Sequence, residues 1–216
     1  MTPLKLFDYG PSANCYKVRL LLAHLQRDYE RSPIDIFGGG TLTEEFGRIN
    51  PLGPTPVVQV GPDAYLAESN AILVFLAQGT PYLTDDPLRA RVVGWLVYEQ
   101  TEVMWNLGGL RFRLLTGRLA PEDPDAVQRR AAGEQALAHL DQHLARERFL
   151  VGDAYGIADI AVYAYTHIAN EAGHDLDRSP YVTAWTARAQ SQPGYMNDLD
   201  PYPPNARAGA GRSMYD

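Results

Sequence analysis

Residues 4–25, LKLFDYGPSANCYKVRLLLAHL, place a strand directly before an amphipathic helix. The apolar run from Leu4 to Phe7 is typical of a strand, and Gly10-Pro11 breaks it. The stretch after this break carries apolar side chains at the i, i+3, i+4, i+7 spacing of one helix face. These side chains are Val18, Leu21, Leu22 and Leu25. The segment therefore predicts a strand that runs into the N-terminus of a helix.

The polar residues at the start of this helix are suited to holding an anion. Ser12, Asn14 and Cys15 crowd the helix N-terminus, where unpaired backbone N–H groups and the helix dipole stabilise negative charge. A hydroxyl, an amide and a thiol could each hold a thiolate, and the thiol could become one. A thiol with a pKa of about 8.5 needs about 2.7 kcal/mol to be mostly ionised at neutral pH. One hydrogen bond to the charge supplies about 1.5–3 kcal/mol and the helix end about 0.3–1 kcal/mol, so no metal or buried cation is needed to ionise the thiol.

Composition limits the possible function classes. The chain has 216 residues, of which 45% are apolar and 21% charged, which suits one large or two small domains with a sizeable core. The net charge of −7 argues against a nucleic-acid partner, and no run approaches the roughly 18 apolar residues of a membrane span. The first residues lack a signal-peptide pattern. Cys15 is the single cysteine, which favours a reduced, cytoplasmic location.

Strand and helix signals divide the chain into two parts. In the first part they predict a strand over residues 31–37, a short helix over 41–49 opened by Thr41, a hairpin over 57–66 and a helix over 71–77. Beyond residue 84 only helical patterns recur, near residues 87–109, 124–146, 157–170 and 181–189. We therefore expect a mixed α/β domain in residues 1–79 and an all-helical domain in residues 87–216. The latter includes an irregular tail from Asp200 that is rich in Pro and Gly.

Two further motifs of the first part fit a peptide ligand. Within Gly53-Pro54-Thr55-Pro56, a cis bond before Pro56 would turn the backbone groups of Thr55 outward, ready to pair with an extended peptide. Glu68 and Ser69 precede a helix, so the Ser69 hydroxyl and the helix N–H groups suit a carboxylate while Glu68 suits an ammonium group. A carboxylate, an ammonium group, an extended backbone and a thiolate together describe glutathione.

Five segments of the chain together carry a family resemblance: SANCYKVRLLL (12–22), NPLGPTPVV (50–58), ESNAILVFLA (68–77), VGDAYGIADIAVYAY (151–165) and QPGY (192–195). Through these segments the chain resembles a bacterial-type cytosolic glutathione transferase along nearly its whole length. The resemblance implies a thioredoxin-like α/β N-terminal domain packed on an all-α C-terminal domain, a homodimer, and a cis bond before Pro56. It also implies that glutathione binds along Thr55, Pro56, Glu68 and Ser69.

The start of the third predicted helix of the second part departs from the family pattern. The family usually has Ser or Thr three residues before Asp159, and this chain has Gly156. Glycine at such a cap costs only a few tenths of a kcal/mol. Because Asp159 can still reach back to the N-cap backbone, we expect the cap to survive and Asp159 to be structural.

Three residues are candidates for the group that activates the thiol. Ser12 lies where serine-type members hold the thiolate, and Cys15 lies near the cysteine of members that form a mixed disulfide. Ser12 and Asn14 also resemble the Thr-x-Asn corner of members that reduce glutathionyl disulfides. We interpret Ser12 as the catalytic hydroxyl, Asn14 as its helper and Cys15 as the alternative. The competing interpretation is that Ser12 and Asn14 are plain helix caps and that Cys15 is a small buried side chain.

The sequence does not define the second substrate. Tyr9, Trp105 and Phe112 are candidates for an apolar substrate pocket, although aromatic residues at helical spacing more often belong to a core or a dimer interface. His139 and His143 have a metal-like spacing, but a solvated helix face explains them better. We expect an enzyme of detoxification that transfers glutathione to an apolar electrophile, with no nucleic-acid or membrane partner. The alternatives are glutathione-dependent disulfide reduction, dehalogenation or isomerisation, and a non-catalytic interaction module.

Overall fold

The structure is a computed structural model that describes residues 4–84 and 87–215. The chain divides into two compact units, Met1–Leu76 with Met196–Asp216 and Ala77–Tyr195. The tail therefore groups with the α/β unit and not, as we expected, with the helical one. Within the residues that the structure describes, no helix is both long and apolar enough to cross a bilayer.

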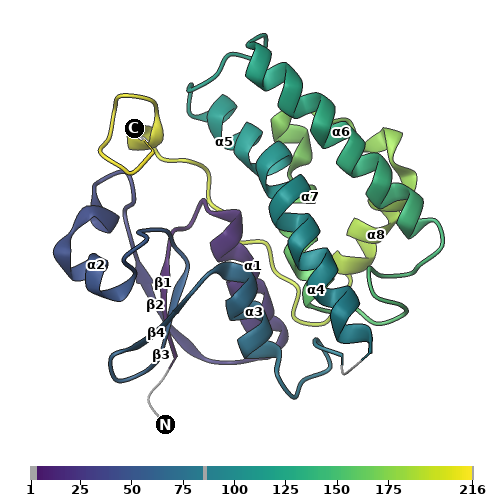
Figure 1. The fold of residues 1–216 in the computed structure, drawn as a ribbon, viewed down its shortest axis with the longest axis horizontal. Coiled ribbons are helices and arrows are strands. Elements are labelled where there is room, and N and C mark those ends of the chain that lie inside the picture. The colour runs from purple at the N-terminus through teal and green to yellow at the C-terminus, as the bar shows by residue number, and fades with distance from the viewer. Residues whose placement is uncertain (1–3, 85–86, 216) are drawn as a thin grey trace. The chain divides into compact units, whose positions relative to one another are not determined.

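The first unit is a four-stranded sheet with helices on both sides. The strand order is β2-β1-β3-β4, in which β1 pairs in parallel with β2 and antiparallel with β3. α1 and α3 lie on one side of the sheet and α2 on the other (Figure 1). This is the thioredoxin-like arrangement that the family resemblance implied. The elements are β1 Leu4–Asp8, α1 Ala13–His24, β2 Tyr29–Pro33, α2 Glu44–Ile49, β3 Val57–Gly61, β4 Ala64–Ala67 and α3 Ser69–Ala77.

The sheet core follows from the alternation of side chains along the strands. Phe7 of β1 and Val57 of β3 point to the side of α2, where the ring of Phe46 meets the ring of Phe7 at a centroid distance of 6.4 Å. Their neighbours Leu6 and Val58 are also fully buried. Because adjacent strand residues face opposite sides, both faces of the sheet carry apolar side chains and both need a covering helix.

Two local predictions in this unit are wrong in their boundaries. The second strand runs over Tyr29–Pro33 and not over residues 31–37, because it pairs with β1 from Leu4 opposite Tyr29 to Asp8 opposite Pro33. The cap of α2 is Thr43, whose hydroxyl accepts from the Phe46 N–H at 3.1 Å. Thr41, which we expected to be the cap, lies instead in a short 3₁₀ turn.

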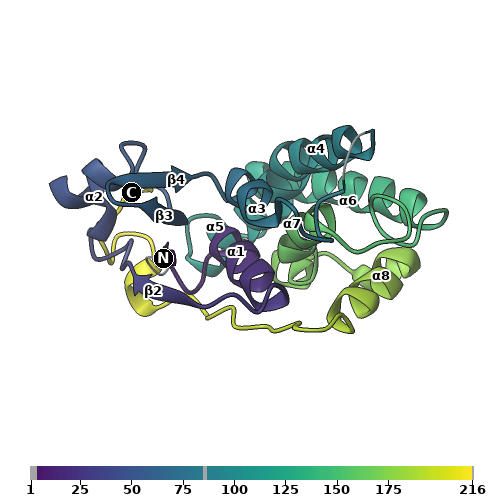
Figure 2. The ribbon, with the colours of Figure 1, turned by 90° about the horizontal axis from the view of Figure 1, so that it is seen from below.

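The segment from Met196 to Tyr215, here called the C-terminal strap, is tied to the first unit along its length (Figure 2). Arg19 of α1 is fully buried and its guanidinium contacts Asp8 at 2.6 Å and Asp198 of the strap at 2.9 Å. A buried charge needs such partners, because an unpaired guanidinium would lose its hydration without compensation. Further hydrogen bonds to the strap are Tyr16 Oη to Met196 O at 2.8 Å, Asn205 Nδ2 to Asp35 Oδ2 at 3.0 Å, and Arg212 N to Phe37 O at 2.8 Å.

We expect Asp198→Asn to lower the free energy of unfolding by about 1 kcal/mol and to expose the strap to proteases, because the amide oxygen still accepts a hydrogen bond but the charge is lost. Limited proteolysis followed by mass spectrometry measures cleavage within the strap. Arg207→Ala is the control, since Arg207 is an exposed residue of the same strap. Equal cleavage rates in the two variants would show that the Arg19–Asp198 pair does not hold the strap.

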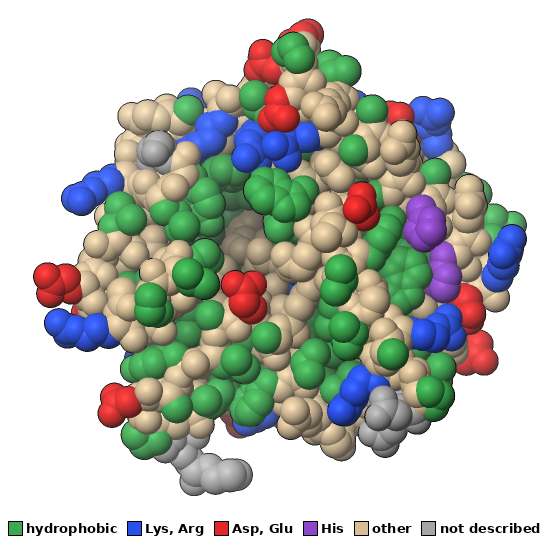
Figure 3. Space-filling model, in the orientation of Figure 1, with side chains coloured by type: hydrophobic (Ala, Val, Ile, Leu, Met, Phe, Trp, Pro, Cys, Tyr) green, Lys and Arg blue, Asp and Glu red, His purple; other side chains and the backbone are tan. Residues whose placement is uncertain are grey.

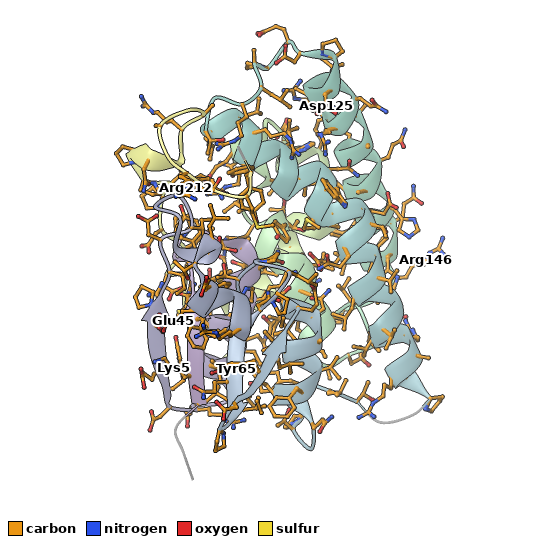
Figure 4. All side chains as sticks on the ribbon, turned by 60° about the vertical axis from the view of Figure 1, so that its left-hand side comes forward. Lys5, Glu45, Tyr65, Asp125, Arg146 and Arg212 are labelled. Carbon is orange, nitrogen blue, oxygen red and sulfur yellow. The ribbon has the colours of Figure 1, made fainter. Side chains whose placement is uncertain are left out.

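The second unit is helical. Gly108 ends a π-helical turn, Glu99–Gly108, and the ring of Tyr165 occupies the space that a Cβ of Gly108 would need. The helices are α4 Leu88–Tyr98, α5 Gly109–Leu115, α6 Pro124–Leu144, α7 Ile157–Thr166 and α8 Pro180–Gln190. Figure 4 labels Asp125, near the start of α6, and Arg146, just after its end.

The carboxylate of Asp159 organises the core of the helical unit. Its Oδ2 accepts from the Gly156 N–H at 3.1 Å, which confirms the expected cap of α7. Its Oδ1 accepts from the Leu150 N–H at 3.0 Å and from the Trp185 indole Nε1 at 2.8 Å. The last two bonds were not expected from the sequence. Through these bonds Asp159, which is 1% exposed, links α7, α8 and the loop before α7.

The two histidines of α6 differ in their exposure to solvent. His139 is exposed, but the ring of His143 lies 4.6 Å from the ring of Trp95 and a ring nitrogen lies 3.1 Å from Leu150 O. Figure 3 shows histidine side chains at this surface beside apolar ones. His143 therefore packs against α4 and does not belong to the fully solvated face that we expected.

Candidate functional site

The first unit brings together the three motifs that the sequence singled out. The Ser69 hydroxyl at the start of α3 donates to Asn14 Oδ1 at the start of α1, at 3.0 Å. The side chain of Thr55 hydrogen bonds to the thiol of Cys15. The N-terminal ends of two helices and the loop before β3 therefore meet at one place.

Ser12 is the N-cap of α1. Its Oγ accepts from the Cys15 N–H at 3.3 Å, and the side chain is half-buried. A serine hydroxyl has one donor and two acceptor sites, and capping uses an acceptor. The O–H can therefore be directed at an anion while the cap stays in place. The cap and thiolate-holding interpretations of Ser12 are compatible with each other.

Cys15 is a buried thiol. It is 0% exposed, and its sulfur accepts from the Tyr9 N–H at 3.4 Å. Burial, followed by the nearby charge of Asp8, raises the pKa of the Cys15 thiol to about 12. Because the thiolate is the nucleophile and not the thiol, this environment favours the packing interpretation of Cys15.

Lys17 is a polar residue of the site that the sequence interpretation missed. Its ammonium nitrogen donates to Asn14 Oδ1 at 2.8 Å, to Ser69 Oγ at 3.4 Å and to Asn70 Oδ1 at 3.5 Å, and the residue is 0% exposed. It adds a positive charge to the N-terminal end of α3, where the helix dipole already favours an anion. The available signal was that Lys17 lies next to Val18 on the apolar side of the predicted helix, because a charge buried there needs polar partners.

Glu68 has an unusual backbone conformation directly before α3. Its φ of +67° lies in the left-handed region, which costs a non-glycine residue about 1–3 kcal/mol and is enriched at ligand sites. The Glu68 side chain is exposed, whereas the adjacent Ser69 is 4% exposed. An exposed carboxylate and a buried hydroxyl thus lie side by side at a helix N-terminus.

The loop before β3 is held by its neighbours. The peptide bond between Thr55 and Pro56 is cis, as the resemblance implied. The side-chain amide of Asn50, which is 5% exposed, donates to Pro54 O at 2.8 Å. This bond fixes the start of the loop, so that Thr55 and Pro56 are presented on a rigid support.

The three aromatic candidates for a substrate pocket do not share one unit. Tyr9 lies in the first unit, where it is 6% exposed and its ring packs on Phe37 at a centroid distance of 5.9 Å. Trp105 and Phe112 lie in the second unit, each under an arginine, with guanidinium-to-ring distances of 5.6 Å from Arg129 and 4.9 Å from Arg118. Their role in substrate binding stays a prediction.

Comparison with known proteins decides the family. Residues 2–78 match the model of the glutathione S-transferase N-terminal domain, and residues 124–188 match that of the C-terminal domain. The chain belongs to the glutathione S-transferase family. The α/β and all-helical units described above are the two domains of this family.

Individual glutathione S-transferase relatives cover nearly the whole chain. The chain is 30% identical to Glutathione S-transferase 3 of Zea mays, over 96% of this chain and 100% of that protein. It is 31% identical to Disulfide-bond oxidoreductase YfcG of Escherichia coli (strain K12), over 86% and 89%. The crystal structure of a glutathione S-transferase from Pseudomonas fluorescens [Pf-5] is 41% identical, covers 92% of this chain and 100% of that chain, and superposes with a TM-score of 0.88. These relatives support a glutathione-related enzyme activity.

Proposed function

We propose that this protein ionises the thiol of glutathione and transfers the sulfur to an apolar electrophile. The observation that carries the proposal is the contact between Asn14 and Ser69, which joins the N-terminal ends of α1 and α3. One helix end can hold the thiolate and the other the γ-glutamyl carboxylate of the same tripeptide. Thr55 and Pro56 lie in the loop between them in the chain and would pair with the cysteinyl backbone.

In the proposed reaction, Ser12 stabilises the thiolate of glutathione. Its O–H donates to the sulfur once the thiol proton has left to solvent, and the N-terminus of α1 adds its dipole. Together these supply about 2–4 kcal/mol, which matches the about 2.7 kcal/mol needed to ionise a thiol at neutral pH. The thiolate electron pair then forms the new bond to the electrophilic carbon. In a substitution, the leaving group departs with the electron pair of the bond that breaks. In an addition, the electron pair of the double bond moves to the neighbouring carbon, which then takes up a proton.

At the N-terminus of α3, the charges of the protein are complementary to those of a γ-glutamyl group. The ammonium group of Lys17 and the N-terminus of α3 favour the carboxylate, and the exposed Glu68 carboxylate favours the α-ammonium group. In the ligand complex the Ser69 hydroxyl would turn from Asn14 Oδ1 to the carboxylate. The Ser69 hydroxyl therefore has a hydrogen-bond acceptor both in the free protein and in the ligand complex.

We expect Ser69→Ala to weaken glutathione binding about 10- to 100-fold, because one hydrogen bond to a charged group contributes about 1.5–3 kcal/mol. Isothermal titration calorimetry with reduced glutathione measures this. Ser69→Thr keeps the hydroxyl and is the matched control. Wild-type protein that shows no saturable binding at millimolar glutathione would overturn the proposed function.

A second candidate reaction is glutathione-dependent disulfide reduction. The 31% identity to the Escherichia coli disulfide-bond oxidoreductase and the Ser12-x-Asn14 spacing favour it. Parallel assays with an aryl halide and with a small disulfide separate the two reactions. We also propose a cytoplasmic homodimer with a role in detoxification. The exposed apolar residues Leu88, Val93 and Val97 of α4 support a dimer contact.

A further inference from the structure

A cavity of about 390 Å³ lies on the helical unit between α6 and the segment that leads into α8. Residues 134–142 of α6 form one wall, and residues 173–179 form the other. In Figure 4 this helix runs between the labels of Asp125 and Arg146. All the lining residues belong to the helical unit, and none of them belongs to the proposed glutathione site.

The ring of His174 lines this cavity and lacks a hydrogen-bond partner. It is 4% exposed, and within residues 4–84 and 87–215 neither ring nitrogen is hydrogen-bonded. Glycine is unfavourable within a helix, but a Cβ on Gly133 of α6 would lie 2.6 Å from His174 Cε1, so glycine makes room for the ring. Buried polar groups are nearly always hydrogen-bonded, and an unpartnered imidazole at a cavity therefore points to a ligand group.

The environment of His174 keeps the imidazole neutral. Burial lowers its pKa, and the nearby charges of Glu134 and Arg130 act in opposite directions, the first raising and the second lowering this pKa. The Arg130 guanidinium is directed to Pro121 O, at 3.4 Å. A neutral imidazole has one nitrogen that accepts a hydrogen bond. The ring can therefore accept from a ligand N–H group.

The α6 wall carries a carboxylate at each end and apolar side chains between them. Glu134, Leu137, Ala138 and Asp141 follow the i, i+3, i+4, i+7 spacing of one helix face, and all four line the cavity. At 1.5 Å per residue, the two carboxylates lie about 10 Å apart along the helix axis. An aliphatic chain with a cationic group at each end has the complementary pattern.

The remaining charges of the cavity also favour a cation. Asp141 Oδ1 accepts from the N–H groups of Tyr181 and Val182 at 2.8 and 3.0 Å, so this carboxylate is held in place by the start of α8. Asp175 adds a third carboxylate, and Arg178 is the one guanidinium among the lining residues. Three carboxylates and one guanidinium give a net charge of −2.

We propose that this cavity binds an aliphatic diamine or polyamine. One ammonium group lies between Glu134 and His174, the methylene chain covers Leu137 and Ala138, and the other ammonium group contacts Asp141. A metal ion does not fit, since within the described residues no three His, Cys, Asp or Glu side chains are placed to hold one. The site is separate from glutathione binding and does not depend on the proposed function.

Calorimetry with spermidine tests the proposal on the full chain without glutathione. The terminal ammonium groups of spermidine can span the two carboxylates of α6. We expect saturable binding of spermidine, and binding of n-butylamine that is at least about tenfold weaker, because one charged contact is lost. γ-Aminobutyrate should also bind at least about tenfold more weakly, because its carboxylate would face a carboxylate of the protein.

Two variants test the two ends of the α6 wall against general electrostatic attraction. Glu134→Gln should weaken spermidine binding about tenfold. Glu122→Gln is the matched control, because Glu122 is an exposed carboxylate of the same unit outside the cavity and its loss changes the net charge equally. His174→Phe keeps a flat ring without the acceptor and should also weaken binding about tenfold. A thermal melt shows whether it folds, and Glu134→Gln decides the question alone if it does not.

Three results would overturn the diamine proposal. The first is wild-type protein that shows no saturable binding of spermidine. The second is n-butylamine or γ-aminobutyrate that binds as tightly as spermidine, since the pairing of two ammonium groups with two carboxylates would then have no effect. The third is an equal loss of affinity in Glu134→Gln and Glu122→Gln, which would show only the attraction of a cation to an acidic protein.

Discussion

Asp159→Ala should lower the free energy of unfolding by about 3–5 kcal/mol, because it leaves several buried donors without their acceptor. The donors are the N–H groups of Leu150 and Gly156 and the indole N–H of Trp185. The bonds from Leu150 and Trp185 are buried, so water cannot replace the carboxylate there, whereas the Gly156 N–H is only partly buried. Denaturant unfolding followed by tryptophan fluorescence measures the loss, and a decrease below about 1 kcal/mol would contradict this account.

Asp159→Asn is the matched control for the charge. The amide oxygen can still accept from Leu150 and Trp185, which both bond to Oδ1, while the amide nitrogen faces the Gly156 N–H. We therefore expect a loss of only about 1 kcal/mol, from the cap alone.

The wild-type protein and Asp159→Asn should also differ in how their free energy of unfolding depends on pH. Burial, opposed by the three hydrogen bonds, raises the pKa of Asp159 from 3.8 to about 6. The folded state then holds the proton more tightly than the unfolded state, so this group's contribution to stability decreases as the pH rises from about 4 to about 6. The change amounts to about 3 kcal/mol over that window, and it should be absent in Asp159→Asn. Unfolding curves at several pH values compare the two slopes.

Ser12→Ala should lower kcat/KM for glutathione transfer to an aryl halide by about 100-fold, because one donor to a developing or full anion contributes about that much. Binding of glutathione should persist, since the other helix end is unchanged. The pKa of the bound thiol should rise by about one to two units, as expected for the loss of one charged hydrogen bond. The pH dependence of turnover and the thiolate absorbance of the complex measure this shift.

Two further variants separate the role of the Ser12 hydroxyl from its role as a helix cap. Ser12→Gly also lacks the hydroxyl but costs the helix only a few tenths of a kcal/mol. If the hydroxyl acts on the thiolate, the glycine and alanine variants lose the same activity and differ only in stability. Cys15→Ala should stay within a few-fold of wild type, because the Cys15 thiol is buried and its pKa is about 12. Full turnover in Ser12→Ala together with none in Cys15→Ala would reverse the assignment.

Local features of this chain could be predicted because they depend on residues close in sequence. The strand over Leu4–Asp8, the cap by Ser12 and the cap by Asp159 each involve groups within about four residues, and their patterns are visible in the sequence. The cap of α2 was predicted wrongly because the local sequence offers two candidates and does not distinguish them. Thr41 and Thr43 both offer a capping hydroxyl, and which of them caps depends on where the preceding loop leaves the sheet.

Contacts between distant residues were decided only by the tertiary structure. The bounds of β2 follow from its pairing with β1, and the role of Lys17 depends on Ser69, 52 residues later. The strap is the extreme case, because Asp198 meets Arg19 across 179 residues. A tail rich in Pro and Gly has no periodic pattern that reveals which surface it covers. The sequence by itself determined the family resemblance and the caps of α1 and α7, because these depend on local patterns, and tertiary packing alone decided that the C-terminal strap docks on α1.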